Sequence, residues 1–181
     1  VVDAAIDEGV TLFDTADSYG DSEEILGTAL DGRRDQVIVA TKFGWDVGGA
    51  NGPDWGARGS RRYIRRAVER SLRRLRTDWI DLYQLHRPDG VTPMEESLAA
   101  LTELVREGKV RYVGSSNLAA WQVADADWLA RTRGSERFVS AQNHYSLLDR
   151  GVEADLVPAC ERYGIGLLPY FPLANGLLTG K

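Results

Sequence analysis

Short apolar runs alternate with longer amphipathic stretches along the whole chain. The apolar runs have the length of strands and are apolar nearly throughout, which is typical of parallel strands that are covered on both faces. We predict strands over TLFDTA (11–16), VIVATK (37–42), IDLYQLH (80–86), VRYVGSSN (110–117), FVSAQN (138–143) and GLLPYF (166–171).

The stretches between these strands carry the signals of helices. Residues 60–76 place apolar side chains on one face, at Ile64, Val68, Leu72 and Leu75. The motif TPME at 92–95 indicates a capping box with proline at the first helical position, and Gly108 ends that helix. Further helix candidates are the first residues of the chain, the stretch from Asp21 or Ser22 to about Leu30, and residues 118–131 and 153–163.

Strands that alternate with helices leave two main α/β architectures, a doubly wound sheet and a (β/α) barrel. A doubly wound dinucleotide-binding fold usually has a G-x-G-x-x-G turn after its first strand, and the sequence contains none. We therefore expect a single domain over residues 1–181 that is part of a (β/α)8 TIM barrel, with about six of the eight strand–helix units. Because residue 1 is Val and the chain opens on a helical pattern, we expect the sequence to come from a longer protein.

Every predicted strand carries a polar or aromatic functional group near its C-terminal end. These residues are Asp14, Lys42, His86, Ser116 with Asn117, Gln142 and Tyr170. In a (β/α) barrel the C-terminal ends of the strands form the active-site face. We therefore expect these side chains to surround one pocket.

Four of the polar residues suit the reduction of a carbonyl group. Tyr19, five residues after Asp14, could donate a proton, although a free phenol has a pKa of about 10. An ammonium such as that of Lys42 would lower the pKa of the phenol, and Asp14 could hold the ammonium in place. His86 could hydrogen-bond the substrate oxygen. Each residue alone also has an ordinary structural interpretation, so the prediction depends on their combination.

The segments FDTADSYG, VIVATKFG, LYQLHRPD, VGSSN, AQNHYSLLDR and YFPLANGLLTGK together resemble aldo-keto reductases. The resemblance covers essentially all 181 residues. It implies the reduction of an aldehyde or ketone to an alcohol by hydride transfer from NAD(P)H. It also implies that Tyr19 is the general acid, Lys42 tunes it, Asp14 pairs with Lys42, and His86 orients the carbonyl.

The same resemblance implies a nicotinamide site. Ser116, Asn117 and Gln142 would bind the carboxamide, and Tyr170 would stack on the ring. The segment that binds the adenosine 2′-phosphate in this family would follow the eighth strand, outside these 181 residues. NADP(H) is therefore the cofactor expected by resemblance, and NAD(H) is not excluded. With strands missing from the barrel, we expect the 181 residues alone to bind cofactor weakly and to be inactive.

Composition and charge narrow the other possibilities. Lys and Arg number 22 against 27 Asp and Glu, a net charge of −5, which disfavours nucleic acid or an anionic membrane as a partner. Cys160 is the only cysteine, which fits a reducing, cytoplasmic location, and the two histidines lie far apart, so no metal-site spacing occurs. The expected partner is a small carbonyl substrate; the sequence leaves the oligomeric state open.

An arginine-rich segment and a glycine-rich loop can each be interpreted in two ways. Nine arginines between Arg58 and Arg76 indicate the solvated face of a helix, with a nucleic-acid patch as the alternative. The loop 44–59 contains Trp45, Trp55 and six glycines. It follows the strand that bears Lys42, so it could enclose a substrate or be a plain surface loop.

Two rival functions fit the same pattern. A Schiff-base aldolase on a barrel would use Lys42 as its nucleophile, and the Asp14 partner argues against it. A nicotinamide-binding sensor would retain the fold without catalysis.

Overall fold

The computed structural model describes residues 1–180 of the chain. Six strands form one sheet in which every strand runs parallel to its neighbours and the spatial order follows the chain order. The strands are β1 Leu12–Asp14, β2 Ile38–Phe43, β3 Ile80–Leu85, β4 Val110–Ser116, β5 Ser140–His144 and β6 Gly166–Tyr170.

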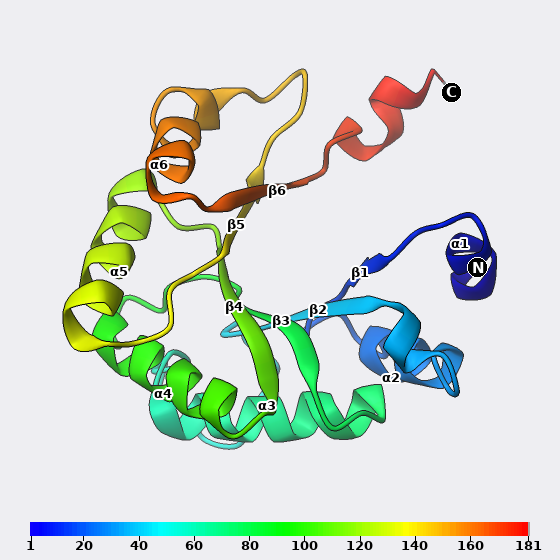
Figure 1. Ribbon diagram of the computed structural model, residues 1–181, viewed down its shortest axis with the longest axis horizontal. Coiled ribbons are helices and arrows are strands. Elements are labelled where there is room, and N and C mark those ends of the chain that lie inside the picture. The colour runs from blue at the N-terminus through cyan, green and yellow to red at the C-terminus, as the bar shows by residue number, and fades with distance from the viewer. Residues whose placement is uncertain (181) are drawn as a thin grey trace.

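Helices connect successive strands and lie on the outer side of the curled sheet (Figure 1). They are α1 Val2–Asp7, α2 Ser22–Ala29, α3 Arg61–Leu75, α4 Met94–Arg106, α5 Ala120–Arg133 and α6 Leu156–Tyr163. Short 3-10 segments are η1 Arg34–Gln36, η2 Gly151–Glu153 and η3 Ala174–Thr179. The result is a half-barrel with six parallel strands and helices between them, which confirms the predicted α/β class and the partial TIM barrel.

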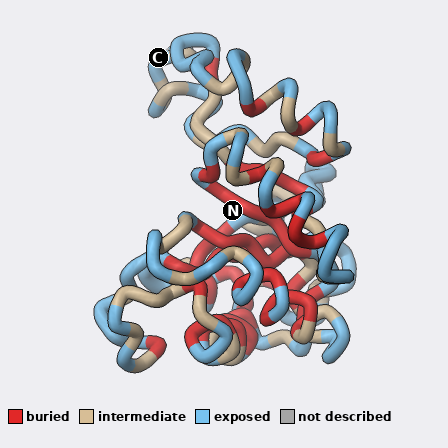
Figure 2. Tube along the Cα trace, turned by 90° about the vertical axis from the view of Figure 1, so that its left-hand side faces the viewer, coloured by how far each residue is buried: buried red, intermediate tan, exposed pale blue. Residues whose placement is uncertain are grey.

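All six predicted strands are present, and the differences lie at their ends. β1 stops at Asp14 rather than at residue 16, and β5 begins at Ser140 rather than at residue 138. Burial differs more. The middle strands are buried along most of their length, whereas Leu12 in β1 is 40% exposed and β6 has no buried residue (Figure 2). These two edge strands have a sheet neighbour on one side only, so their apolar residues are less covered than we predicted.

The longest helix, α3, shows how the pattern of the sequence becomes packing. Its predicted apolar face, at Ile64, Val68, Leu72 and Leu75, is buried in the core. The Ser60 hydroxyl accepts a hydrogen bond from a backbone N–H of the first turn, and Arg76 ends the helix in a left-handed conformation. Tyr63, Ala67 and Ser71 are buried as well, and the positions of this helix that are not buried hold arginines and Glu69.

The predicted capping box of α4 is wrong. Pro93 rather than Thr92 occupies the N-cap position, and no side chain caps the helix. The Thr92 hydroxyl instead donates to the carboxylate of Asp89, which also accepts the backbone N–H of Gly59. Asp89 therefore draws Thr92 into a turn before the helix begins. Asp21 occupies the N-cap position of α2, also without a side-chain cap.

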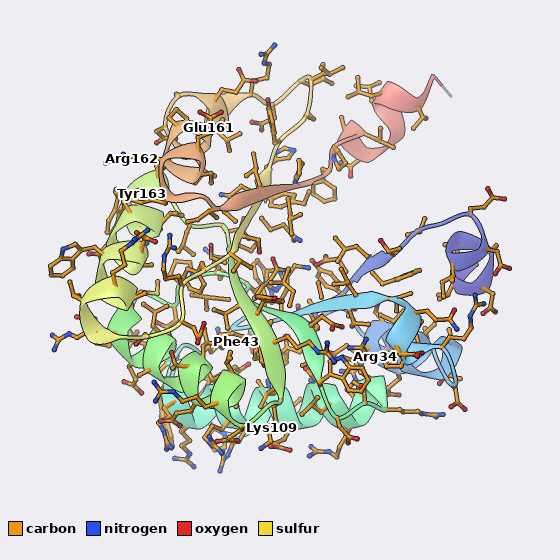
Figure 3. All side chains as sticks on the ribbon, viewed as in Figure 1. Arg34, Phe43, Lys109, Glu161, Arg162 and Tyr163 are labelled. Atoms are coloured by element: carbon orange, nitrogen blue, oxygen red, sulfur yellow. The ribbon has the colours of Figure 1, made fainter. Side chains whose placement is uncertain are left out.

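An ion pair joins the N-terminal ends of β2 and β3, away from the predicted site. Arg34, labelled in Figure 3, lies 2.6 Å from the Asp81 carboxylate, which also accepts the backbone N–H of Val39. The Arg34 guanidinium stacks 4.6 Å from the ring centroid of Trp79. Phe43 is the last residue of β2, at the end of the strand that faces the predicted site.

Within residues 1–180, no helix is both long enough and apolar enough to cross a membrane.

Candidate active site

A cleft of about 450 Å³ opens at the C-terminal ends of the strands. It is lined by Ser18, Tyr19, Trp45, His86, Ser116, Asn117, Gln142, Tyr170 and Phe171. Most of the residues predicted from the strand ends therefore come together around one pocket. Asp14 and Lys42 do not line the cleft. They lie beneath it, inside the half-barrel.

Lys42 is completely buried and its ammonium is held by two groups. Its Nζ donates to Asp14 Oδ2 at 2.5 Å and to the backbone carbonyl of Thr15 at 2.9 Å. The other oxygen of Asp14 accepts hydrogen bonds from Gln84 Nε2 and from Gln142 Nε2, both at 3.1 Å. Asp14, in β1, thus joins side chains from three other strands, β2, β3 and β5. Burial lowers the pKa of Lys42, and the charge and hydrogen bond of Asp14 oppose that effect.

Sequence reasoning missed Gln84 as a site residue. It is fully buried in β3, two positions before His86, so both side chains point to the same face of the sheet. The sequence did contain a signal for Gln84: it is a polar residue in an apolar strand, two positions before His86, and therefore on the same face of the sheet as His86. Gly114 on the neighbouring strand makes room for it, because a Cβ there would lie 3.1 Å from Gln84 Cγ and 2.4 Å from Ser140 Oγ.

Tyr19 lies above Lys42, on the loop that follows β1. Lys42 Nζ is 5.1 Å from the centroid of the Tyr19 ring. The prediction that the ammonium would lower the pKa of this phenol is wrong for this structure. Burial raises the pKa of Tyr19, and the negative charge of Asp14 raises it further.

His86 stands next to Tyr19, with ring centroids 5.7 Å apart and the rings edge to face. Burial lowers the pKa of His86 to about 4, and the positive charge of Lys42 contributes in the same direction. His86 is therefore neutral near pH 7, with one ring N–H to donate. On its other side the ring of Trp45 lies 5.0 Å away.

The four residues predicted to bind nicotinamide form a connected group. Ser116 Oγ donates to the Gln142 carbonyl at 2.8 Å, and Asn117 Nδ2 donates to the His86 carbonyl at 2.9 Å. Tyr170 Oη donates to Asn117 Oδ1 at 3.0 Å. One face of the Tyr170 ring is stacked on His144, with the two planes only 1° apart.

These donors and acceptors fit a flat ring that carries a carboxamide. Gln142 donates through Nε2 to Asp14, so its Oε1 is the atom that it can offer to an amide N–H. Since His144 covers one face of Tyr170, the other face is left for a ligand ring at the cleft. His144 itself also lies 2.9 Å from Asp149, so its contacts are structural.

The loop 44–59 contributes one of its two tryptophans to the cleft. Trp45 lines the pocket, while Trp55 is 77% exposed and lies over the guanidinium of Arg62. Of the two tryptophans of this loop, only Trp45 is therefore placed to contact a ligand in this cleft. Phe171, the residue after Tyr170, also lines the cleft.

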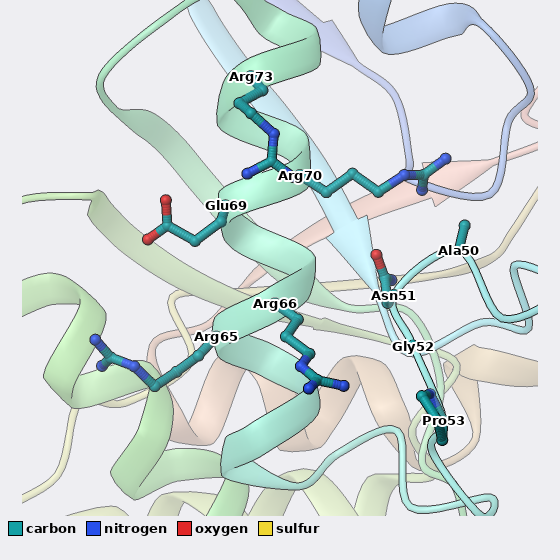
Figure 4. Close-up of a pocket in the computed structure, with 9 residues that line it drawn as sticks. All are labelled: Ala50, Asn51, Gly52, Pro53, Arg65, Arg66, Glu69, Arg70 and Arg73. Carbon is teal, nitrogen blue, oxygen red and sulfur yellow. The ribbon is translucent and has the colours of Figure 1, made fainter.

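A larger hollow, of about 570 Å³, lies on the outside of the half-barrel, away from the predicted catalytic residues. Figure 4 shows Arg66 and Arg70 extending from α3 toward the segment from Ala50 to Pro53. Other arginines of α3 are paired: Arg61 and Arg65 both contact Glu103. None of the residues predicted to take part in carbonyl reduction lines this hollow. We therefore place the candidate site in the smaller cleft, which Tyr19 and His86 line.

No group of three or more metal-ligating side chains occurs in the part of the chain that the structure describes. Cys160 is buried, and burial raises the pKa of its thiol, as befits a small core residue.

Comparison with known proteins agrees with this geometry. The profile of the aldo/keto reductase family matches residues 1–181. The chain is 42% identical to the uncharacterized oxidoreductase YrpG of Bacillus subtilis (strain 168) and 39% identical to probable aldo-keto reductase 1 of Glycine max, in both cases over 100% of this chain. It is also 39% identical, over 99% of its length, to versiconal hemiacetal acetate reductase of Aspergillus parasiticus.

The chain spans only part of these relatives: 59% of the Bacillus protein, 51% of the Glycine protein and 57% of the Aspergillus protein. The match nevertheless runs from the first residue to the last and includes every strand end that forms the cleft. The chain therefore belongs to the aldo/keto reductase family.

Proposed function

We propose that the complete protein reduces an aldehyde or ketone to an alcohol with a nicotinamide cofactor. The observation that carries this proposal is the ion pair between the buried Lys42 and the partly exposed Asp14, beneath a cleft lined by Tyr19 and His86. The names of the relatives, reductases and oxidoreductases, support the same class of reaction.

Tyr19 is the proposed general acid. A bound dihydronicotinamide would supply a hydride to the carbonyl carbon, and the carbonyl oxygen then needs one proton to become a hydroxyl. The phenol of Tyr19 is protonated at neutral pH, as that of an ordinary tyrosine is, and therefore has that proton to give; its raised pKa keeps it protonated. Lys42, whose Nζ lies 5.1 Å from the centroid of the Tyr19 ring, is proposed to hold this ring in place together with Asp14.

His86 is the proposed orienting residue. With a pKa of about 4 its imidazole is neutral at pH 7, so it can donate a hydrogen bond to the substrate oxygen without losing or gaining a charge. Its edge-to-face position beside Tyr19 would let both side chains reach the same oxygen.

Ser116, Asn117 and Gln142 are the proposed ligands of the carboxamide, and Tyr170 the proposed partner of the nicotinamide ring. Gln142 also bonds Asp14, so it would link the position of the cofactor to the residue that holds Lys42. NADP(H) is the proposed cofactor, with NAD(H) as the alternative, on family resemblance alone.

The contacts of Lys42 argue against a Schiff-base aldolase. A lysine nucleophile must reach the substrate, yet Lys42 is completely buried and does not line the cleft. Asp14 and the carbonyl of Thr15 hold its ammonium from below.

The test is a spectrophotometric assay of the protein expressed from the complete open reading frame. NADPH and NADH oxidation would be followed with a panel of aldehydes and ketones, and cofactor binding by fluorescence. We expect turnover of at least one carbonyl compound. Tight cofactor binding without any turnover would favour the sensor, and trapping of a substrate on Lys42 by borohydride would favour the aldolase.

A further inference from the structure

Asn51 is an unusual residue in the loop between β2 and α3. Among residues 45–58, all of which the structure describes, it is the only buried one, at 4% exposed. Burying an amide costs free energy unless its polar atoms are hydrogen-bonded. The amide nitrogen of Asn51 makes two hydrogen bonds, whereas its Oδ1 is buried without a partner, so the nitrogen is the atom through which this side chain can anchor the glycine-rich loop.

The two N–H groups of the Asn51 amide bond two different parts of the fold. Asn51 Nδ2 donates to Asp17 Oδ2 at 3.1 Å and to Tyr63 Oη at 3.0 Å. Tyr63 Oη in turn donates to the backbone carbonyl of Trp45 at 3.1 Å. Asn51 thus contacts the loop after β1 directly, through Asp17. It is also linked to Trp45, which lines the cleft, through Tyr63 in the first turn of α3.

Asp17 is fixed at both its backbone and its side chain. Its backbone N–H donates to the Lys42 carbonyl at 3.1 Å, and its own carbonyl accepts from Arg70 at 3.4 Å and from Arg74 at 3.5 Å. Tyr19 follows only two residues later. The hydrogen bonds that hold Asp17 in place therefore also restrict the movement of Tyr19, the proposed general acid.

The Arg74 side chain adds a second contact on the far side of Tyr19. It donates to the backbone carbonyl of Gly20 and lies 3.2 Å from the carboxylate of Glu24. The loop that carries Tyr19 is therefore held from α3 at both flanks, and Asn51 is the side chain that connects this loop to the loop of Trp45. Figure 4 shows Asn51 and Arg70 facing the same hollow.

We propose that Asn51 is a positioning residue that fixes Tyr19 and Trp45 relative to each other across the cleft. The proposal rests on the proposed function for its effect on catalysis, while its effect on the two loops stands independently. Asn51 does not line the cleft, so it would act only through Asp17 and Tyr63.

The electrostatics of Asp17 agree with this role. Burial raises the pKa of Asp17 to about 7, and the hydrogen bond from Asn51 opposes the rise. Glu23 raises this pKa as well, whereas Arg70 and Arg74 lower it. Without Asn51, Asp17 would lose the donor that its carboxylate faces, and the attachment of the Tyr19 loop would weaken.

The test compares Asn51→Ala with Asp54→Ala in the protein from the complete reading frame. Asp54 lies in the same loop, where its carboxylate bonds Gly56 and Arg58 and has no contact with Asp17. Losing the net contribution of about one hydrogen bond should destabilise these loops by about 1.4 kcal/mol, which corresponds to a tenfold change. In hydrogen exchange followed by mass spectrometry, Asn51→Ala should therefore speed exchange about tenfold in peptides covering 15–20 and 44–50. Asp54→Ala should leave the exchange rate of residues 15–20 unchanged.

A double substitution keeps the test decisive if Asn51→Ala folds poorly. Asn51→Asp alone places two carboxylates together and should loosen both loops. Combining it with Asp17→Asn exchanges the donor and the acceptor and should return the exchange of residues 15–20 toward the wild-type rate. Exchange in 15–20 that is the same in wild type, Asn51→Ala and Asn51→Asp would overturn the proposal.

Activity gives a second, separate measurement. In carbonyl reduction, Asn51→Ala should lower kcat about tenfold and leave the cofactor Kd nearly unchanged, because misplacing a reacting group slows the chemical step. If the wild type shows no turnover, the proposed function fails and the exchange data still judge the positioning role. If the wild type turns over and the kcat of Asn51→Ala is unchanged, the positioning role fails alone.

Discussion

The Lys42 ammonium and the Asp14 carboxylate lie 2.5 Å apart, and this contact joins β2 to β1 at the floor of the cleft. The lysine side chain is almost entirely buried, whereas that of Asp14 is 34% exposed. The pair is asymmetric for that reason: the ammonium depends on the carboxylate more than the reverse. Removing one partner should therefore not have the same effect as removing the other.

Asp14→Asn should destabilise the protein more than Lys42→Met. The first leaves a buried ammonium without its counter-charge, at a cost of about 2–3 kcal/mol, near the low end for buried pairs because Asp14 is partly exposed. The second removes the charge and keeps an apolar chain of similar length. Urea denaturation of both variants and of the double variant measures this. A larger loss for Lys42→Met would contradict this picture of the pair.

The stability of the protein should fall as the pH drops from about 6.5 to about 4, in part because of His86. The folded state holds this imidazole neutral, with a pKa of about 4, while the unfolded chain takes up its proton near pH 6.5. Protons bind preferentially to the unfolded state in this window, which lowers the free energy of unfolding by about 3 kcal/mol in total.

His86→Gln removes that titration, so its free energy of unfolding should change less over the same pH range. Parallel urea titrations of wild type and variant at several pH values provide the comparison. Equal slopes for the two proteins would mean that His86 is not held neutral.

Gly114→Ala should damage the site from within the barrel. The added Cβ would meet Gln84 Cγ at 3.1 Å and Ser140 Oγ at 2.4 Å, and would push Gln84 away from Asp14. Overpacking of this kind costs about 1–3 kcal/mol. Gly166→Ala is the matched control, because the nearest atom to its new Cβ is 3.6 Å away. Thermal unfolding of both variants tests the difference. Equal losses of stability in the two variants would show that Gln84 does not need the space that Gly114 leaves.

The order of strands and helices could be predicted from the sequence because it follows from local periodicity. The strand at 80–86 and the helix at 60–76 differ from the structure by one residue at most at each end. β1 was predicted two residues too long at its end, because Thr15 and Ala16 follow the strand without a break in the pattern but belong to the loop of Tyr19, although the backbone N–H groups of Thr15 and Asp17 still donate to β2. Periodicity carries no information about where regular pairing with the neighbouring strand ends.

The candidate site could be predicted in outline because parallel strands of a barrel end on one face. What could not be predicted are contacts between residues distant in the sequence. Gln84 donates to Asp14 over a separation of 70 residues, and the carboxylate of Asp89 accepts the backbone N–H of Gly59 over a separation of 30. The direction of the pKa of Tyr19 also depends on its depth of burial, which the sequence does not contain.

The central claim is that Tyr19 donates the proton in carbonyl reduction, and Tyr19→Phe tests it most directly. The measurement is kcat for NADPH-dependent carbonyl reduction by the protein from the complete reading frame, with the cofactor Kd determined alongside. Tyr112→Phe serves as the control, because Tyr112 is exposed on β4 and does not line the cleft. We predict that Tyr19→Phe lowers kcat about 10²–10⁴-fold with an unchanged cofactor Kd, while Tyr112→Phe has no effect. A Tyr19→Phe variant that keeps the wild-type kcat would contradict the claim.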